Sequence, residues 1–512
     1  MLVKTFGAAV SGIDARTVTM EVNVSPGIKY YIVGLPDSAV KESEQRTESA
    51  IRENGWRWPG QRIVINMAPA DIRKEGSAYD LPLAVGILAA SGQIAPQHLE
   101  RTLIMGELSL DGSLMPIKGA LPMALKAKAD GFESFILPHQ NAKEAAVVSG
   151  LHIYGAHNIR QVVDLLETGN GIEPTVVDAA TEFSATPTDD MPDFADVKGQ
   201  DNAKRALEIA AAGGHNILLI GSPGSGKSMM AKRLPGILPP LTMEEALETT
   251  KIHSVAGKLK GETSLLTTRP FRSPHHTISN VALVGGGTFP QPGEISLAHN
   301  GVLFLDELPE FQRQVLEVMR QPLEDRIISI SRSRFAVEYP ASFMLVASMN
   351  PCPCGYFNDP AKTCTCGPGQ VQKYLGRISG PLLDRIDLHI EVVPVPVGEL
   401  ASMKQGESSA TIRSRVVRAR EVQSARFKDV AGVHCNAQMT TKLLNTYARP
   451  DEAGSQILKM AMERLGLSAR AYDRILKVSR TIADLAGAEN VGAEHIAEAI
   501  QYRSLDRDTW GN

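Results

Sequence analysis

The sequence feature that most constrains this chain is a glycine-rich loop, Gly221-Ser222-Pro223-Gly224-Ser225-Gly226-Lys227-Ser228. It matches the phosphate-binding pattern G-x-x-x-x-G-K-[ST] at all four fixed positions. The apolar run before it, residues 215–220, is typical of a buried parallel strand, and residues 229–234 have a helix-forming composition. This setting predicts a nucleotide site in which backbone N–H groups surround a phosphate, Lys227 contacts the β- and γ-phosphates, and the Ser228 hydroxyl binds Mg²⁺. The alternative, a glycine-rich turn with a chance lysine, does not explain the flanking strand and helix.

A second apolar run ends in two acidic residues. Residues 301–307 have the sequence Gly-Val-Leu-Phe-Leu-Asp-Glu, which predicts a buried strand with Asp306 and Glu307 at its carboxyl end. Asp306 would hold Mg²⁺ through its water shell, and Glu307 would polarise the attacking water. The alternative is an acidic helix cap before Leu308. A further strand, residues 343–349, ends at Asn350, whose amide can orient the same water.

These segments, preceded by residues 193–200 and an amphipathic helix over 203–212, resemble an AAA+ ATPase module. The resemblance implies that residues 301–307 are a Walker B element and that Asn350 is sensor 1. Residues 380–387 resemble the segment that delivers an arginine finger to the neighbouring subunit, with Arg385 as the candidate and Arg377 in reserve. Either arginine could instead be a solvated charge. Residues 467–474 resemble the sensor-2 motif, with Arg470 reaching back to the phosphates. Arginines divided between two subunits imply a ring, and the family implies a homo-hexamer.

The N-terminal part, residues 1–170, alternates β-rich runs with helical stretches such as 39–54, which indicates an α+β domain. Residues 74–82, 106–112 and 114–117 resemble the proteolytic domain of Lon. Lon-type proteolysis needs a serine nucleophile and a lysine base, which the family pattern places at Ala78 and Leu121, and neither can do this chemistry. Ser77 and Lys118 lie nearby, so a shifted register would supply a dyad. We expect a proteolytically inactive scaffold or protein-contact domain.

The remaining boundaries follow from composition. Residues 171–192 lack sustained apolar periodicity and are expected to be a linker. Residues 193–397 form the expected AAA+ domain, which includes a cysteine loop at 350–368, and residues 398–512 form a C-terminal helical lid. Within the lid, residues 411–426 predict a basic amphipathic helix, for which a solvated face is favoured over DNA contact. The expected fold class is an α/β P-loop AAA+ module with a helical lid, preceded by a Lon-protease-like α+β domain.

Two insertions distinguish the module from a generic AAA+ domain. One covers residues 269–299, and the other, residues 327–339, alternates like a β-hairpin with Arg332 and Arg334 near its tip. Together they resemble the magnesium-chelatase-like AAA+ branch, and with the Lon-like domain they resemble the YifB/ComM family across essentially the whole chain. That resemblance implies a hexameric DNA helicase promoting branch migration during recombination in natural transformation. It also implies ATP and Mg²⁺ as cofactors, with single-stranded and branched DNA and recombination proteins as partners. Arg332 and Arg334 are then the candidate DNA contacts.

Four of the five cysteines lie close together as two C-x-C pairs, and these are Cys352, Cys354, Cys364 and Cys366. Four thiolates on one loop suit tetrahedral Zn²⁺. The usual knuckle spacing is C-x-x-C, and four buried or free thiols are the alternative. Interleaved proline and glycine favour the metal, because so polar a loop has no evident core to fold around.

The formal net charge is −4, so the chain carries no global basic signature. Any nucleic-acid contact must come from a local patch or from residues that oligomerisation concentrates. The N-terminus lacks the apolar core of a signal peptide, and the longest apolar run, residues 81–90, is too short to span a bilayer. We therefore expect a cytoplasmic protein without membrane contact, in a reducing compartment where clustered cysteines indicate metal rather than disulfides.

Two other functions compete with a DNA motor. One is a chelatase-type ATPase, and the other is a protein-remodelling ATPase that uses the Lon-like domain as a partner-binding scaffold. A chelatase motor works with a large porphyrin-binding partner, and the added N-terminal domain and cysteine loop depart from that pattern. The DNA motor is therefore the leading hypothesis.

Overall fold

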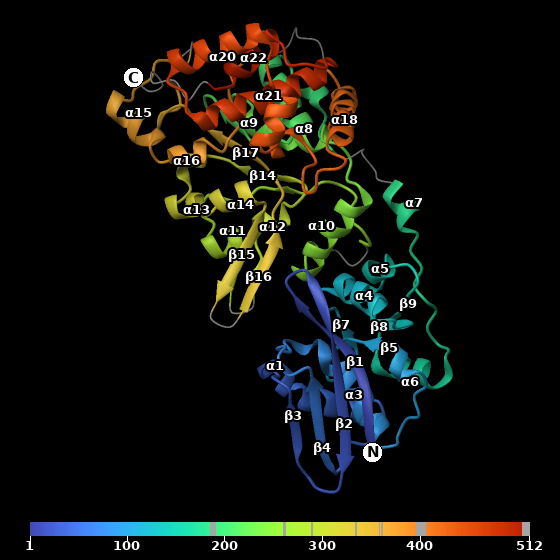
Figure 1. Ribbon diagram of the computed structural model, residues 1–512. Helices are drawn as coiled ribbons and strands as arrows, with labels where there is room; N and C mark the ends of the chain where they lie inside the picture. The colour runs from blue at the N-terminus through green and yellow to red at the C-terminus, as the bar shows by residue number, and fades with distance from the viewer. Residues whose placement is uncertain are drawn as a thin grey trace.

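The computed structural model describes residues 1–184, 191–259, 263–287, 290–332, 335–357, 359, 362–395 and 406–503. Figure 1 shows an N-terminal body of strands and helices and a second body that carries a parallel sheet and the C-terminal helices. The short helix α7, Ala179–Ser184, lies on the path between them. No helix within these described residues is long and apolar enough to cross a bilayer.

A seven-stranded mixed sheet, in the order β3-β4-β2-β1-β5-β8-β9, frames the N-terminal body. β2 pairs antiparallel with both β1 and β4, and the other neighbours are parallel. Alternate residues of β2, including Val18, Met20 and Val22, are fully buried, so one face of the sheet packs against helices. The strands span Leu2–Ser11 (β1), Asp14–Ser25 (β2), Tyr30–Val33 (β3), Arg62–Ala68 (β4), Thr102–Ile104 (β5), Ser134–Pro138 (β8) and His152–Ala156 (β9).

The central helix of this body is α3, Asp80–Ala90, which packs on β1 and β2 and buries every residue. A helix that is apolar all round is stable in water only when it is enclosed. The helix predicted over 39–54 is divided at Glu42, because Asp37 caps a separate first turn through a 2.8 Å bond from the Val40 N–H. The other elements are α1 (Ser38–Lys41), α2 (Ser43–Glu53), α4 (Ala120–Ala129), α5 (His139–Ala146), α6 (Ile159–Thr168), β6 (Glu107–Leu108) and β7 (Leu114–Met115).

The second body contains a five-stranded parallel sheet in the order β11-β14-β17-β10-β18. Every residue of β10, β14 and β17 is buried, as expected for parallel strands covered on both faces. Ile217 and Leu219 join the core under α8 (Asp201–Gly213) and the C-terminal helices, while Leu218 and Ile220 join a separate core on the other face. The strands span Phe271–Arg272 (β11), Val302–Leu305 (β14), Met344–Met349 (β17), Ile217–Ile220 (β10) and Leu388–Glu391 (β18).

The predicted hairpin is present as β15 (Ile327–Arg332) and β16 (Phe335–Pro340), with Arg332 opposite Phe335. It extends toward the N-terminal body (Figure 1), where a Cβ at Gly12 in the β1–β2 turn would lie 3.2 Å from Val337. The other elements of the second body are α9 (Lys227–Arg233), α11 (Asn280–Val284), β12 (Gly285–Gly286), β13 (Gln291–Pro292), α12 (Glu294–Leu297), α13 (Arg313–Glu317), α14 (Arg320–Asp325), α15 (Pro368–Leu375) and α16 (Gly380–Leu383).

The two bodies also meet through α10, Met243–Val255, which belongs to the second body in sequence but packs against α4. Leu241 and Ala246 are buried in the core of the N-terminal body. The Lys251 ammonium lies 2.7 Å from the Asp14 carboxylate, and the Ser254 carbonyl accepts a 3.1 Å bond from the Gly119 N–H. The N-terminal body is therefore fixed to the second body by a helix and not only by the segment 171–192.

The C-terminal helices cover the sheet through a buried polar network centred on Asp387. Its carboxylate accepts bonds from the Arg474 guanidinium at 2.9 Å and from the Asn216 N–H at 2.9 Å. Burial alone would raise the pKa of Asp387, but Arg474 and the nearby His215 imidazole bring it well below its usual value. The helices are α18 (Ser409–Arg426), α19 (Thr441–Tyr447), α20 (Glu452–Leu465), α21 (Ala469–Ala486) and α22 (Ala493–Gln501).

Removing Arg474 should destabilise the protein strongly, because the Asp387 carboxylate would stay buried without its cation. We expect Arg474→Ala to lower the free energy of unfolding by about 3–5 kcal/mol. Arg470→Ala is the matched control one turn earlier on α21, since the Arg470 side chain is 61% exposed and its pair should contribute at most about 1 kcal/mol. Chemical denaturation at neutral pH measures both. Equal losses would contradict the assignment of Asp387 as the buried centre of this contact.

Candidate nucleotide-binding site

The phosphate loop connects β10 to α9, as the sequence predicts. Gly226 has φ of +92°, a conformation that favours glycine, and a Cβ at Gly221 would overlap the Val392 carbonyl oxygen. Both glycines are therefore required by the backbone itself. The loop begins at the carboxyl end of a central strand, which is the place where parallel α/β sheets bind ligands.

Lys227, the first residue of α9, is largely buried beneath this loop. Its ammonium donates to the Gly221 carbonyl at 2.7 Å and the Ser222 carbonyl at 3.0 Å, and it lies 3.3 Å from the Asn350 amide oxygen. Burial lowers the pKa of Lys227, while the carboxylates of Asp306 and Glu307 oppose that shift. A phosphate at this position would bring the negative charge that stabilises the ammonium.

The predicted magnesium ligands lie together. The Ser228 hydroxyl donates a 2.7 Å bond to one carboxylate oxygen of Asp306, and Ser348 is hydrogen-bonded to the other. Hydroxyl and carboxylate oxygens are the ligands that Mg²⁺ prefers, so these residues fit the ion. Sequence reasoning missed Ser348, although a single polar residue in the otherwise apolar strand β17 is a usable signal.

Glu307 follows Asp306 in a left-handed conformation, with φ of +54°. Its N–H lies 3.1 Å from an Asp306 carboxylate oxygen, and its side chain is 57% exposed. One carboxylate oxygen lies 3.6 Å from Nδ1 of His276, whose ring packs against His275 and edge-on to Phe311. Both histidines lie in the insertion at residues 269–299, and no role was predicted for them from the sequence.

The three predicted arginines lie outside this cluster. Arg385 is buried and paired with Glu324 at 2.5 Å, whereas Arg377 is 52% exposed and paired with Glu310 at 2.9 Å. Arg470 pairs with Asp384 at 3.4 Å instead of contacting the phosphate loop of its own chain. Phosphate contact by any of the three therefore stays a prediction.

The four clustered cysteines come together as the spacing predicts. The Cys352 and Cys354 sulfurs are 3.3 Å apart, the Cys354 and Cys364 sulfurs 3.5 Å, and the Cys352 and Cys364 sulfurs 3.7 Å. All four sulfurs, including that of Cys366, lie within 4.8 Å of one another. Zinc–sulfur bonds of about 2.3 Å place the sulfurs of a tetrahedral site about 3.8 Å apart. The cluster can therefore hold a metal ion.

The residues considered for proteolysis form no dyad in the described part of the chain. The Ala78 carbonyl accepts a 2.7 Å bond from the Gly106 N–H, and Leu121 is fully buried. Lys118 is exposed and lies over the end of α10, where a Cβ at Gly257 would be 2.9 Å from its Cε atom. It makes no contact with Ser77, so a shifted register gains no support.

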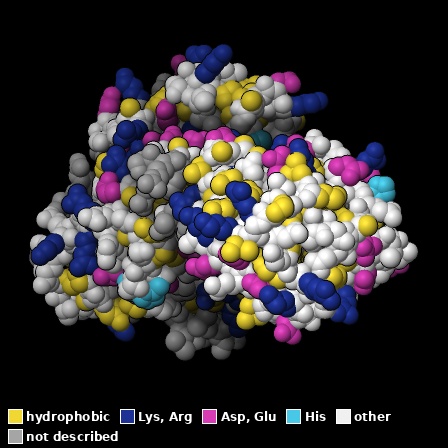
Figure 2. Space-filling model, turned by 90° about the horizontal axis from the view of Figure 1, so that it is seen from below, with side chains coloured by type: hydrophobic (Ala, Val, Ile, Leu, Met, Phe, Trp, Pro, Cys, Tyr) yellow, Lys and Arg dark blue, Asp and Glu magenta, His cyan; other side chains and the backbone are white. Residues whose placement is uncertain are grey.

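The basic side chains are distributed without one dominant patch on the surface shown. Figure 2 shows lysine and arginine side chains interspersed with acidic and apolar ones on the face seen from below. Several arginines of α18 are used internally: Arg413 donates to the Gly236 carbonyl, and Arg415 pairs with Glu208 and Glu407. Of the candidate DNA contacts, Arg332 ends β15 with its side chain outside the described structure, and Arg334 lies outside the described residues.

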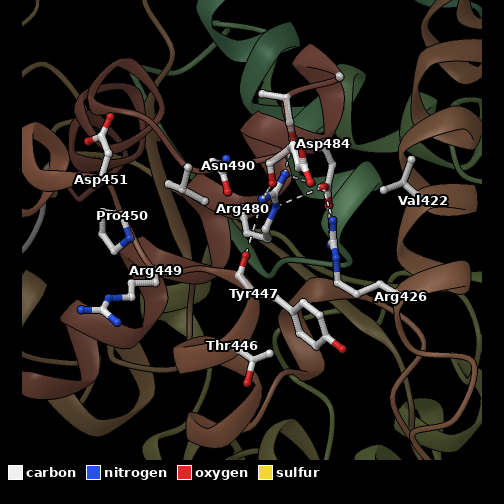
Figure 3. Close-up of a pocket in the computed structure, with 14 residues that line it drawn as sticks. Val422, Arg426, Thr446, Tyr447, Arg449, Pro450, Asp451, Arg480, Asp484 and Asn490 are labelled. Carbon is white, nitrogen blue, oxygen red and sulfur yellow. Dashed lines mark hydrogen bonds and ion pairs between the residues drawn. The ribbon is translucent and has the colours of Figure 1, made fainter.

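A cavity of about 740 Å³ lies within the lid, between α18, α21 and residues 446–451 (Figure 3). The Asp484 carboxylate in its wall accepts bonds from Arg426 at 2.5 Å and from Arg480 at 3.1 Å. These three charges satisfy one another, so the cavity offers no unpaired charge from them. The candidate nucleotide site is therefore the phosphate loop and not this cavity.

Comparison with known proteins agrees with this geometry. Residues 193–400 match the family model described as magnesium chelatase, subunit ChlI, and residues 20–141 and 406–503 match models of ChlI and of its C-terminal part. Competence protein ComM of Haemophilus influenzae is 45% identical over 512 residues, covering 98% of this chain and 97% of the relative. The chain belongs to the YifB/ComM family of magnesium-chelatase-like proteins.

Other relatives extend this result. The protein YifB of Salmonella typhimurium is 45% identical over 501 residues, covering 98% of this chain and 96% of the relative. Lon protease 2 of Bacillus subtilis is 29% identical over 159 residues, covering 28% of this chain and 27% of the relative, which gives the N-terminal body only a partial similarity to Lon. Membership of the magnesium-chelatase-like AAA+ family implies an ATPase that uses ATP and Mg²⁺.

Substitution of Lys227 should affect ATP binding, whereas substitution of Glu307 should affect ATP hydrolysis. Lys227→Ala should reduce ATP affinity by about 100-fold or more, because it removes the buried cation at the phosphates. Glu307→Gln should bind ATP normally and hydrolyse it about 10²–10⁴-fold more slowly, because an amide cannot activate water. Binding of a fluorescent ATP analogue and single-turnover hydrolysis separate the two effects. Normal turnover by Glu307→Gln would remove Glu307 from the catalytic role.

Proposed function

We propose that this protein is an ATP-driven hexameric DNA motor that unwinds DNA and promotes branch migration when single strands recombine during natural transformation. One observation carries the proposal: the full-length similarity to a competence protein accompanies a phosphate loop whose lysine contacts Asn350 and whose serine is hydrogen-bonded to Asp306. Single-stranded and branched DNA are the proposed substrates, and recombination proteins in the cytoplasm are the proposed partners.

In the proposed hydrolysis step, Lys227 binds the β- and γ-phosphates. Ser228 and Asp306 would hold Mg²⁺, which would supply positive charge to the phosphates. Glu307 accepts the proton of the attacking water, and Asn350 orients that water. Lys227 and Asn350 already contact each other at 3.3 Å, so the groups that bind phosphate and position water lie side by side.

The experiment that tests the motor compares ATP turnover without DNA, with single-stranded DNA and with a four-way junction, and measures strand exchange at the junction. We expect DNA to stimulate turnover and junctions to migrate only when ATP is hydrolysed, with Glu307→Gln as the matched inactive protein. A rate of ATP turnover that DNA does not change, but that a protein partner increases, would favour the protein-remodelling alternative instead. The N-terminal body, fixed to the motor through α10, would then be the partner-binding scaffold.

The proposed ring divides its active site between chains, with Arg385 acting on the neighbour's γ-phosphate. Arg385→Ala should assemble but hydrolyse ATP at least about 100-fold more slowly, and mixing it with Glu307→Gln should restore part of the activity. Because Arg385 is paired with Glu324, Glu324→Gln is the control that removes the ion pair and keeps the guanidinium. Analytical ultracentrifugation confirms assembly.

Three outcomes separate these readings. ATPase activity that survives in Glu324→Gln but not in Arg385→Ala would support Arg385 as the arginine finger. Equal loss of ATPase activity in both variants would indicate a structural ion pair. Loss of activity in Arg377→Ala alone would indicate that Arg377, the more exposed arginine, is the arginine finger.

DNA is proposed to contact the ring through the β15–β16 hairpin, where six copies of Arg332 and Arg334 would concentrate positive charge that the acidic chain otherwise lacks. The variant Arg332→Ala/Arg334→Ala should weaken DNA binding and flatten its salt dependence, because phosphate contacts release counterions. Basal ATP hydrolysis and assembly should survive. The exposed Arg418→Ala on α18 is the control, and affinity across a salt series is the measurement. Unchanged unwinding would exclude the hairpin.

The metal at the four cysteines is proposed to be Zn²⁺, because four thiolates prefer it to Mg²⁺ or Ca²⁺. Purified protein should contain about one zinc per chain after dialysis. Replacing Cys352 or Cys364 by serine should abolish retention of the metal, since a closed tetrahedral site requires all four sulfurs. Cys435→Ser is the control, because this buried cysteine lies outside the cluster. Elemental analysis decides the question, and a fully active protein without zinc would refute a required metal.

A further inference from the structure

The cysteine cluster lies directly beside the nucleotide site. Cys352 lies only two positions after Asn350, the residue that directly follows β17 and contacts Lys227. Cys352 is fully buried, and its sulfur lies at the centre of the cluster, close to both Cys354 and Cys364. The position of the first sulfur therefore constrains the position of the Asn350 amide.

The cysteine loop also packs against the phosphate loop. Gly355 has φ of +86°, and a Cβ on it would lie 2.6 Å from Cδ and 2.8 Å from Cγ of Pro223. Such a distance is far below an ordinary van der Waals contact, so the backbone at Gly355 is packed against the Pro223 ring with no room for a side chain. Pro223 is the third residue of the phosphate loop, and the cysteine loop therefore forms part of its support.

The far end of the cysteine loop returns to the same residue. α15 begins at Pro368, shortly after Cys366, and carries Tyr374. Burial raises the pKa of the Tyr374 phenol to about 12, and the Asn350 backbone near the hydroxyl opposes that shift. Asn350 therefore lies near both ends of the loop that carries the four cysteines.

We propose that a metal ion held by Cys352, Cys354, Cys364 and Cys366 braces the ATP site, so that metal occupancy sets nucleotide affinity. The ion would join sulfurs from the two ends of the loop and fix both Asn350 and the Gly355 contact on Pro223. Without it, the two ends of the loop are joined at the cysteines by weak hydrogen bonds to sulfur, such as the 3.4 Å bond from the Cys354 N–H to Cys366. This inference rests on the metal site proposed above, but it does not depend on DNA being the substrate.

The first experiment removes the metal from the full-length protein with a chelator and a thiol-reactive mercurial, reverses the mercurial with a dithiol, and exchanges the buffer. Affinity for a fluorescent ATP analogue is then measured at saturating Mg²⁺ without DNA. We expect a loss of about tenfold or more, which one equivalent of Zn²⁺ reverses and additional Mg²⁺ does not. Unchanged affinity in metal-free protein with an intact circular-dichroism spectrum would overturn the brace.

The second experiment leaves the metal in place and breaks only its contact with the phosphate loop. Gly355→Ala keeps all four sulfurs but adds a methyl group against Pro223, so it should retain zinc and lose nucleotide affinity by about tenfold. Gly432→Ala is the matched control, because Gly432 also has a positive φ, +73°, and a Cβ there meets nothing within 4 Å. The control should retain both zinc and affinity.

These two experiments also cover the case in which metal-free protein unfolds. Full affinity in zinc-loaded Gly355→Ala would show that the loop does not act on the phosphate loop, and the inference would fail. Because nucleotide binding is measured without DNA, a protein that has no motor activity could still confirm the brace, and a working motor could still refute it.

Discussion

Parallel strands bring their carboxyl ends to one edge of a sheet, and this constraint makes the nucleotide site. β10 ends at the phosphate loop, β14 at Asp306 and β17 at Asn350, although these segments are far apart in the sequence. The register pairs Ile220 with Met349 and Leu305 with Ala347, so the three ends lie side by side. Packing on both faces of these strands holds that register, because a slip would move their side chains out of the cores that they fill. The residues of the site have fixed relative positions because the strands that carry them are packed in the core.

The lid is attached to the same strands by charge as well as by apolar packing. Asp387 precedes β18 and binds the Asn216 N–H, which precedes β10, while its other oxygen holds Arg474 on α21. The His215 imidazole is hydrogen-bonded to Thr481 on the same helix at 2.7 Å. A rotation of α21 would therefore have to break buried polar contacts at the start of the strand that carries the phosphate loop. Such contacts favour discrete positions of the lid over continuous movement.

Local patterns predicted much of this arrangement. The helix expected over 411–426 lies within α18, Ser409–Arg426, because Ser408 caps its start through a bond from the Thr411 N–H. Contacts between distant segments could not be predicted, because a pattern shows that a face is apolar or a residue charged without naming its partner. The sequence does not show that Arg385 lies against Glu324 or that Ala246 enters the core of the N-terminal body.

The position of α10 gives the N-terminal body a direct physical connection to the active site. Beyond its contacts with Asp14 and Gly119, α10 carries Glu248, which lies 2.9 Å from Nε2 of His299. The other ring nitrogen of His299 accepts a 3.0 Å bond from the Ser342 N–H, just before β17, and β17 ends at Asn350. This connection runs through a packed helix, the half-exposed Glu248 side chain, the buried His299 ring and a strand. A partner that moved the N-terminal body would therefore act on the strand that precedes Asn350, the residue proposed to orient water. An N-terminal domain connected by residues 171–192 alone could not do this.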